Sequence, residues 1–182
     1  RNMYLDSAGQ PIVDKSLLGP LAAGVPGSVA GMFAAHQKYG KLKWADLLSP
    51  AIALAQNGFK ISAMQARELN ELKATFSKLN PSGTSLLKEG EWLAGDLMVQ
   101  RELANTLSLI RDQGRAGFYE GSVADAIVAE MNRAGGLMTK DDLKNYQAIW
   151  RKPVTGMYKG YKVITMPPPS SGGIALIQLL KS

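Results

Sequence analysis

The chain reads Met166-Pro167-Pro168-Pro169-Ser170-Ser171-Gly172-Gly173-Ile174 at the point where two short alternating runs give way to an apolar run. Proline fixes φ and supplies no backbone N–H, so three in succession predict a stiff extended arm that leaves any sheet. The apolar run that follows, residues 174–180, is typical of a helix. The pattern therefore predicts a rigid arm that fixes the position of a flexible helix start rich in backbone N–H donors.

The two alternating runs before this stretch predict a β-hairpin. Val154–Tyr158 and Tyr161–Thr165 have a period of two, and Lys159-Gly160 between them is typical of a two-residue turn. An isolated two-stranded hairpin is marginally stable in water. We therefore expect these strands to belong to a larger sheet whose other strands lie outside these 182 residues.

Most of the remaining chain has the apolar spacing of short helices with clear start and stop signals. The first half predicts helices from a Ser28 cap to Tyr39 with Gly40 as a left-handed exit, from a Ser49 cap with Pro50 in the first turn to Gly58, and from a Ser62–Gln65 capping box through Phe76. The second half predicts helices from Asp96 to Gly114, from Ser122 with Asp125 to Gly135-Gly136, and a short one capped by Thr139 and Asp142 that holds Leu143 and Tyr146.

The fold class predicted from these patterns is mainly α, an irregular bundle of about six helices with a small β-hairpin and a C-terminal helix. Its organisation is expected to be a lead-in loop over residues 1–23, a helical domain over 24–147, and a segment over 148–182 that holds the hairpin, the proline-rich arm and the terminal helix.

Composition is that of an ordinary globular chain, with 182 residues, 46% hydrophobic and 20% charged. No run approaches the roughly 20 apolar residues needed to cross a bilayer, so no membrane span is expected. The start has neither an initiator Met nor an apolar signal core, which suggests a piece of a longer gene product. The absence of cysteine excludes disulfides, thiolate nucleophiles and cysteine-ligated metals, and it says little about the compartment.

The net charge of +6 raises the question of a nucleic-acid or membrane-surface partner. The charges are scattered, however, and the densest groups are Lys38, Lys41 and Lys43 around one turn and Arg151-Lys152. No aromatic residues are interleaved to stack on bases. A solvated surface, or one covered by a missing partner, explains the charge better, and no nucleic-acid partner is predicted.

Catalytic and metal chemistry have little support in the residues. His36 is the only histidine, on an apolar helix face, so a Ser-His-Asp triad would need it together with Ser170 or Ser171. No G-x-S-x-G elbow surrounds either serine. Capping and the helix dipole explain the acidic pair Asp141-Asp142 without an ion. No catalytic residue, metal or cofactor is predicted in this chain.

Two helix starts are candidates for substrate binding. The stretch Gly24-Val25-Pro26-Gly27-Ser28-Val29-Ala30-Gly31 lacks the ending of a phosphate loop, yet free N–H groups at such a start also attract a carboxylate. The N–H groups around Ser170, Ser171 and Gly172 are placed to face a carboxylate or an oxyanion. The alternative is that prolines and glycines merely reverse the chain there. The candidate substrate-binding residues are Ser170, Ser171, Gly172 and Ser28.

Four stretches together resemble the large subunit of gamma-glutamyltranspeptidases. They are the proline-rich stretch, the Gly24 stretch above, Pro50-Ala51-Ile52-Ala53-Leu54-Ala55-Gln56-Asn57-Gly58-Phe59, and Gly135-Gly136-Leu137-Met138-Thr139-Lys140-Asp141-Asp142-Leu143-Lys144-Asn145-Tyr146. They follow the expected order over nearly the whole chain. The resemblance implies an N-terminal-nucleophile hydrolase with a four-layer αββα parent fold, to whose core residues 148–182 would belong.

The resemblance also implies an activity whose chemical centre lies outside this chain. A precursor cuts itself and exposes a threonine at the start of a small subunit, and this threonine takes the gamma-glutamyl group of glutathione and passes it to water or an amino acid. Its own amine serves as the base, so no histidine is needed. The substrate-clamping arginine lies in an Arg-Glu-x-x-Pro motif that Arg1 does not match, so that role is not given to Arg1.

Several expectations follow from this resemblance. The chain alone should be inactive, its partners should be the small subunit and a gamma-glutamyl substrate, and its location should be periplasmic or secreted. Its residues are equally compatible with the branches that act on glutathione, on cephalosporin side chains or on poly-gamma-glutamate. The alternative reading is a non-catalytic binding or scaffold module with the same helical fold.

Overall fold

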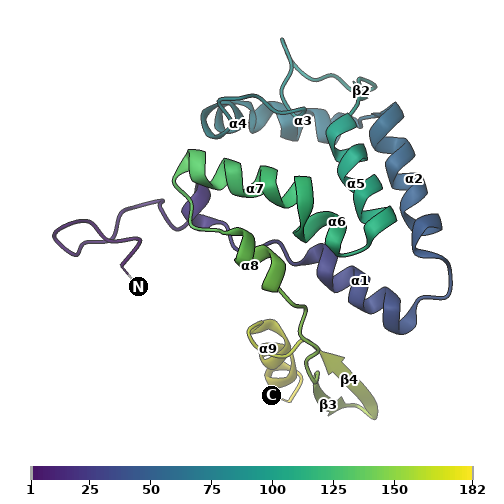
Figure 1. Cartoon of the computed structure of the whole chain (residues 1–182). Helices are drawn as coiled ribbons and strands as arrows, with labels where there is room; N and C mark the ends of the chain where they lie inside the picture. Colours follow the sequence, from purple (N-terminus) through teal and green to yellow (C-terminus); the bar gives the residue numbers. More distant parts are fainter. Residues whose placement is uncertain (1, 182) are drawn as a thin grey trace. The chain divides into compact units, whose positions relative to one another are not determined.

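The computed structural model describes residues 2–181. The chain divides into two compact units, Arg1–Gln147 and Ala148–Ser182 (Figure 1). The chain is mainly helical with a few short strands, as predicted. Among the described residues, no helix has both the length and the apolar character that crossing a bilayer requires. The elements of the first unit are η1 (Pro20–Ala22), α1 (Ser28–Tyr39), α2 (Trp44–Asn57), β1 (Phe59–Lys60), α3 (Ala63–Glu71), α4 (Lys73–Leu79), β2 (Leu97–Met98), α5 (Arg101–Gln113), α6 (Ala116–Tyr119), α7 (Gly121–Ala134) and α8 (Lys140–Asn145).

Helix α1 has the predicted span but not the predicted caps. Its N-cap is Gly27, and Ser28 is the first helical residue and makes no capping hydrogen bond. Gly40 after the helix is extended, with φ −63°, so the left-handed exit predicted there is wrong. The bond from the Gly40 N–H to the His36 carbonyl still closes the last turn without that conformation.

Helix α2 begins at Trp44, so the prediction of a start at Ser49 is wrong. Pro50 lies inside the helix, and the Ser49 hydroxyl donates to the Ala45 carbonyl at 2.8 Å instead of capping. The Trp44 indole donates to the Ile110 carbonyl of α5 at 2.9 Å and meets Phe33 of α1 edge-on at 5.2 Å. These tertiary contacts hold the helical turn that precedes the proline. A helix-start rule based on neighbouring residues cannot predict them.

The segment after α2 builds a small core of its own. Ile61, Ala66, Trp92 and Met98 are buried together, beside the antiparallel pair of β1 and β2, which the sequence did not suggest. The predicted capping box at α3 is confirmed, because the Ser62 hydroxyl accepts from the Gln65 N–H and the Gln65 side chain accepts from the Ser62 N–H. The helix ends at Glu71, however, and α4 follows as a separate helix after Leu72, which is the C-cap of α3 and the N-cap of α4.

Asp96 does not open a helix, and α5 begins only at Arg101. The Asp96 carboxylate instead accepts from the Lys88 ammonium at 2.5 Å and from the Leu93 N–H at 2.8 Å. The hydrogen bond from Lys88, followed by the one from Leu93, lowers the pKa of Asp96. This carboxylate therefore fixes the loop before β2 and is not available as a cap.

Helices α5, α6 and α7 follow one another in close packing, with α5 beside α2 (Figure 1). The short helix α6 was not predicted. Gly117 in it lies so close to α5 that a Cβ there would overlap the carbonyl of Leu109. Helix α7 begins at Gly121 rather than at the predicted Ser122 cap, and it ends at the predicted stop, where Gly135 is left-handed with φ 77°.

The second unit consists of the predicted hairpin and a helix. Strands β3 (Val154–Tyr158) and β4 (Tyr161–Thr165) pair antiparallel around Lys159-Gly160, where both residues have positive φ. Helix α9 (Gly172–Leu179) begins two residues before the predicted start and packs on the hairpin, with Ile177 against Gly156. Between them, Pro168 and Pro169 form a turn that contains a cis peptide bond, so the predicted extended arm is wrong.

Candidate functional site

The start of α9 presents Ser170, Ser171 and Gly172 at the surface of the second unit. Ser171 is the N-cap residue, but its side chain makes no capping bond. Within the described residues, the N–H groups of Ser171 and Gly172 have no hydrogen-bond acceptor. Gly173 behind them is buried against the Met166 carbonyl. This geometry leaves two backbone donors available to an anion.

Ser28 is exposed in the first turn of α1, in the first unit. The structure thus brings Ser170, Ser171 and Gly172 together in the second unit and places Ser28 in the other unit. Arg1 lies outside the described residues. The Gly31 N–H bonds to the Gly27 carbonyl at 3.0 Å, which closes the first turn of α1.

Two motifs that are more than a hundred residues apart in the sequence meet in the first unit. Gly24 and Val25 line one hollow of about 200 Å³ together with Leu137, Met138 and Asp142. The Thr139–Asp142 capping box at α8 is confirmed, and the hydroxyl and N–H of Thr139 lower the pKa of Asp142. Gly24 and Val25, which precede α1, therefore lie beside the start of α8.

Tyr119 of α6 joins these motifs from the inside. Its side chain is 1% exposed, and its hydroxyl donates to the Pro26 carbonyl at 2.6 Å and accepts from the Ala30 N–H at 3.2 Å. Burial raises the pKa of this phenol, which keeps it a neutral donor. The hydroxyl therefore holds both sides of the Gly27 turn. Sequence reasoning missed Tyr119 because nothing local marks a tyrosine whose partners are about 90 residues away.

Arg115 and Tyr146 complete this cluster. The Arg115 guanidinium donates to the carbonyls of Lys144 at 2.7 Å and Tyr146 at 2.6 Å, and it lies 4.7 Å from the centre of the Tyr119 ring. The Tyr146 ring stacks on Tyr119 with centroids 5.9 Å apart, and its hydroxyl lies where a Cβ on Gly27 would be. The cluster positions backbone, and it contains no nucleophile with a base beside it.

His36 has a structural role in this chain. Its Nε2 is bonded to the Leu42 carbonyl at 2.9 Å, and its ring lies 5.1 Å from the Trp44 ring. Ser170 and Ser171 belong to the other unit. Over residues 2–181, no group of His, Asp or Glu side chains has the arrangement of a metal site. The described residues therefore offer exposed backbone donors at the start of α9, and His36 is engaged with the Leu42 carbonyl.

Comparison with known proteins gives consistent matches. The family model for gamma-glutamyltranspeptidase matches residues 1–182. The chain is 44% identical over 180 residues to a glutathione hydrolase proenzyme of Pseudomonas aeruginosa, covering 99% of this chain and 32% of that protein. It is 44% identical over 185 residues to one from Escherichia coli, with 99% and 31% covered.

A solved structure agrees with these matches. The gamma-glutamyltranspeptidase of Helicobacter pylori superposes with a TM-score of 0.95 and 49% identity, covering 99% of this chain and 52% of that one. The 182-residue chain thus spans about a third of the length of the curated relatives named here and about half of the solved chain.

Proposed function

The chain belongs to the gamma-glutamyltranspeptidase family, and from this premise we propose that it is the part of a large subunit that supports the active centre of such an enzyme. The parent enzyme would transfer or hydrolyse the gamma-glutamyl group of glutathione and related amides. Its nucleophile would be the N-terminal threonine of a small subunit cut from the same precursor, outside these 182 residues. The observation that carries the proposal is the family match over all 182 residues.

The described side chains fit the proposal that this chain positions the active centre of the parent enzyme. The lone histidine is engaged with a backbone carbonyl, and no described serine has a histidine as base. The Tyr119 cluster ties α1, α6 and α8 together through backbone atoms. An N-terminal threonine supplies its own base, so the parent enzyme would need rigid walls from this chain and no proton-transfer group.

The hairpin supports the proposal that residues 148–182 belong to the core of an αββα parent fold. One face of the hairpin packs on α9, while Met157 and Ile164 on the other face are 61% and 63% exposed. Large apolar side chains on the open face of two strands are typical of a sheet that continues or is covered. We propose further strands of the parent protein beside them, and a periplasmic or secreted location for the whole.

The first prediction tests whether this chain contains the reactive centre. The purified 182-residue chain should release no product from gamma-glutamyl-p-nitroanilide above a protein-free blank, because the proposed nucleophile lies elsewhere. The parent precursor, expressed from its complete gene, should cut itself into two subunits and then turn over the same substrate. Turnover by the isolated chain would contradict the proposal. A parent that binds partners but lacks activity would favour a scaffold module.

A second prediction concerns the candidate substrate-binding residues Ser28, Ser170, Ser171 and Gly172. In the parent enzyme, replacing Gly172 by proline removes one backbone donor, and kcat/KM should fall by about 10- to 100-fold if that N–H faces substrate. Proline is tolerated at the first helical position, but it disfavours the αR dihedrals of Ser171 before it, so hydrogen exchange of α9 checks that the variant keeps the helix start. Ser28→Ala tests the other helix start in the same assay. Unchanged kinetics for either variant would remove that residue from the site.

A further inference from the structure

An open apolar groove lies between α1, α2 and α5, and its lining includes Val29 but none of the four residues proposed for substrate binding. Its volume is about 590 Å³. Met32 and Tyr39 of α1 and Leu47 of α2 line it and remain 58%, 65% and 48% exposed, above a floor that includes Leu107 and Ile110 of α5. Exposed apolar side chains that are gathered in one hollow mark an interaction surface far better than scattered ones do.

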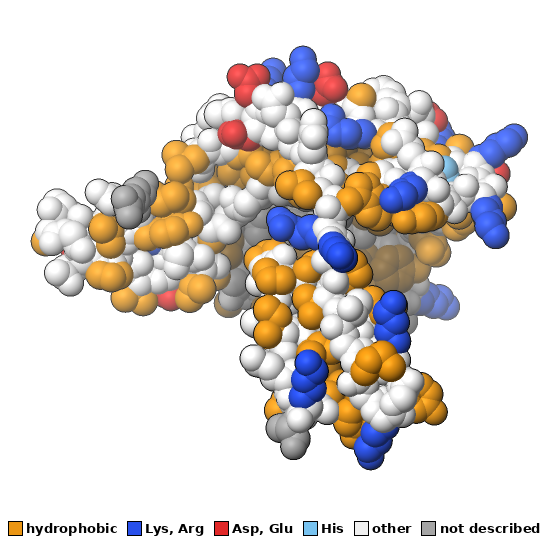
Figure 2. Space-filling model, turned by 90° about the horizontal axis from the view of Figure 1, so that it is seen from below, with side chains coloured by type: hydrophobic (Ala, Val, Ile, Leu, Met, Phe, Trp, Pro, Cys, Tyr) orange, Lys and Arg blue, Asp and Glu red, His pale blue; other side chains and the backbone are white. Residues whose placement is uncertain are grey.

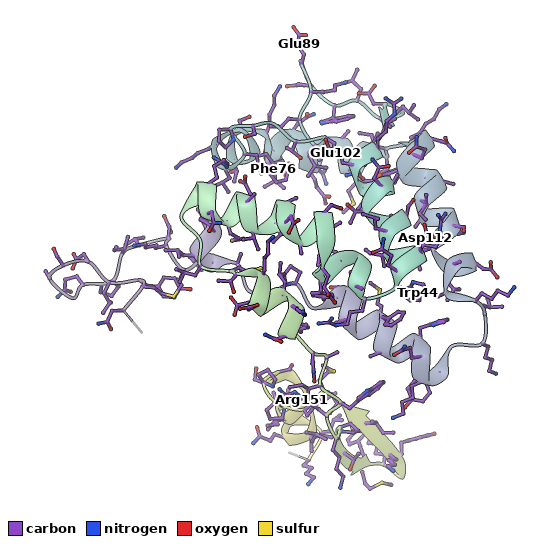
Figure 3. The ribbon with its side chains drawn as sticks, in the orientation of Figure 1. Trp44, Phe76, Glu89, Glu102, Asp112 and Arg151 are labelled. Atoms are coloured by element: carbon purple, nitrogen blue, oxygen red, sulfur yellow. The ribbon has the colours of Figure 1, made fainter. Side chains whose placement is uncertain are left out.

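The groove is already formed without an occupant. Trp44 lies where α1, α2 and α5 meet (Figure 3), with its indole bonded to the Ile110 carbonyl and its ring against Phe33. The bond from His36 to the Leu42 carbonyl holds the turn between α1 and α2 across the end of the groove. A preformed surface costs little ordering on binding. A groove with such fixed walls is better suited to binding one specific partner than to binding many partners non-specifically.

The rim of the groove is basic. Lys41 and Lys43 are exposed in the turn that closes one end, and neither takes part in an ion pair among residues 2–181. Figure 2 shows basic side chains around the histidine at this part of the surface, beside hydrophobic ones. The N-terminus of α2 adds a positive dipole end at Trp44. Asp46 in the first turn of α2 offsets part of this charge, and Lys41 and Lys43 outnumber it.

We propose that this groove binds an acidic amphipathic peptide segment of a protein partner, with large apolar side chains in the groove and carboxylates beside Lys41 and Lys43. The apolar lining selects a protein over a nucleic acid, because it offers no cationic track for a phosphate backbone. Charge complementarity with Lys41 and Lys43 requires a partner segment that is negatively charged. The proposal is independent of the enzymatic reaction, since no candidate substrate-binding residue lines the groove.

The test uses a fluorescein-labelled helical 16-residue peptide with leucines on one face and glutamates on its flanks, and a twin with lysine in place of each glutamate. Anisotropy titrations of the 182-residue chain should show micromolar binding of the acidic peptide and at least about tenfold weaker binding of its twin. Leu47→Asp should weaken binding more than about tenfold, because it puts a charge among the apolar anchors. Leu93→Asp, at a leucine that is 63% exposed outside the groove, is the matched control and should bind normally.

The double variant K41E/K43E separates charge from apolar contact. It should weaken the acidic peptide about tenfold at low salt and lose this difference at high salt, because screening removes exposed-charge interactions. Circular dichroism of each variant checks that it is folded. Equal binding of the two peptides, or normal binding by a folded Leu47→Asp variant, would overturn the proposal. Self-association in sedimentation that Leu47→Asp abolishes would also overturn it, because a second copy would then occupy the groove.

Discussion

Replacing Tyr119 by alanine is expected to lower the free energy of unfolding of the first unit by about 3–5 kcal/mol, the cost typical of removing a fully buried aromatic ring. The Tyr119 residue is 1% exposed, and its ring contacts the Arg115 guanidinium and stacks on the Tyr146 ring. Its removal leaves a cavity and takes away the stacking partner of Tyr146. The midpoint of urea unfolding followed by circular dichroism measures this loss.

The Tyr119→Phe variant separates the hydroxyl from the ring. It keeps the packing but leaves the Pro26 carbonyl and the Ala30 N–H without their partner, which should cost about 1–3 kcal/mol. The control is Tyr161→Ala in the hairpin, where the side chain is 77% exposed and the expected change is within about 0.5 kcal/mol. If Tyr119→Phe unfolded at the same urea concentration as the unchanged chain, the hydroxyl would not hold the Gly27 turn.

The structural signals that the sequence predicted correctly are those made within a few residues. The capping boxes at Ser62 and Thr139 join a side chain to a backbone group three positions away, and both are present. The helix stop at Gly135 and the Lys159-Gly160 turn depend on the conformational freedom of a glycine at positive φ. For such features the residues concerned contain nearly all the information.

The incorrect predictions concern residues whose role is set by distant partners. Ser49 and Pro50 have the pattern of a helix start, but contacts of Trp44 with α1 and α5 extend the helix backward. Asp96 resembles a cap, and the Lys88 ammonium and Leu93 N–H engage its carboxylate instead. The candidate site likewise has one part that was predictable from local sequence and one part that was not. The exposed donors at Ser171 were predictable from the Ser-Ser-Gly-Gly pattern, whereas the contacts of Tyr119 span about 90 residues.

The adjacent glycines at the start of α9 give the sharpest test of how the second unit holds its exposed serines. A Cβ on Gly173 would overlap the Met166 carbonyl oxygen and press on the Thr165 hydroxyl, so the backbone itself must move. Alanine favours a helix by at most about 1 kcal/mol over glycine. The collision should exceed this gain and detach α9 from β4. We therefore expect Gly173→Ala to abolish most of the hydrogen-exchange protection of α9.

Gly172→Ala is the matched control, because the nearest heavy atom to its added Cβ is the Ser170 hydroxyl oxygen at 3.6 Å, an ordinary contact. It should preserve or slightly increase protection of α9, and in the parent enzyme it should retain activity, because the Gly172 N–H is still present. Gly173→Ala should lose that activity, since the N–H groups of Ser171 and Gly172 are fixed only while α9 rests on the end of β4. Similar exchange rates in the two variants would show that the close approach of Gly173 to Met166 does not hold this helix start in place.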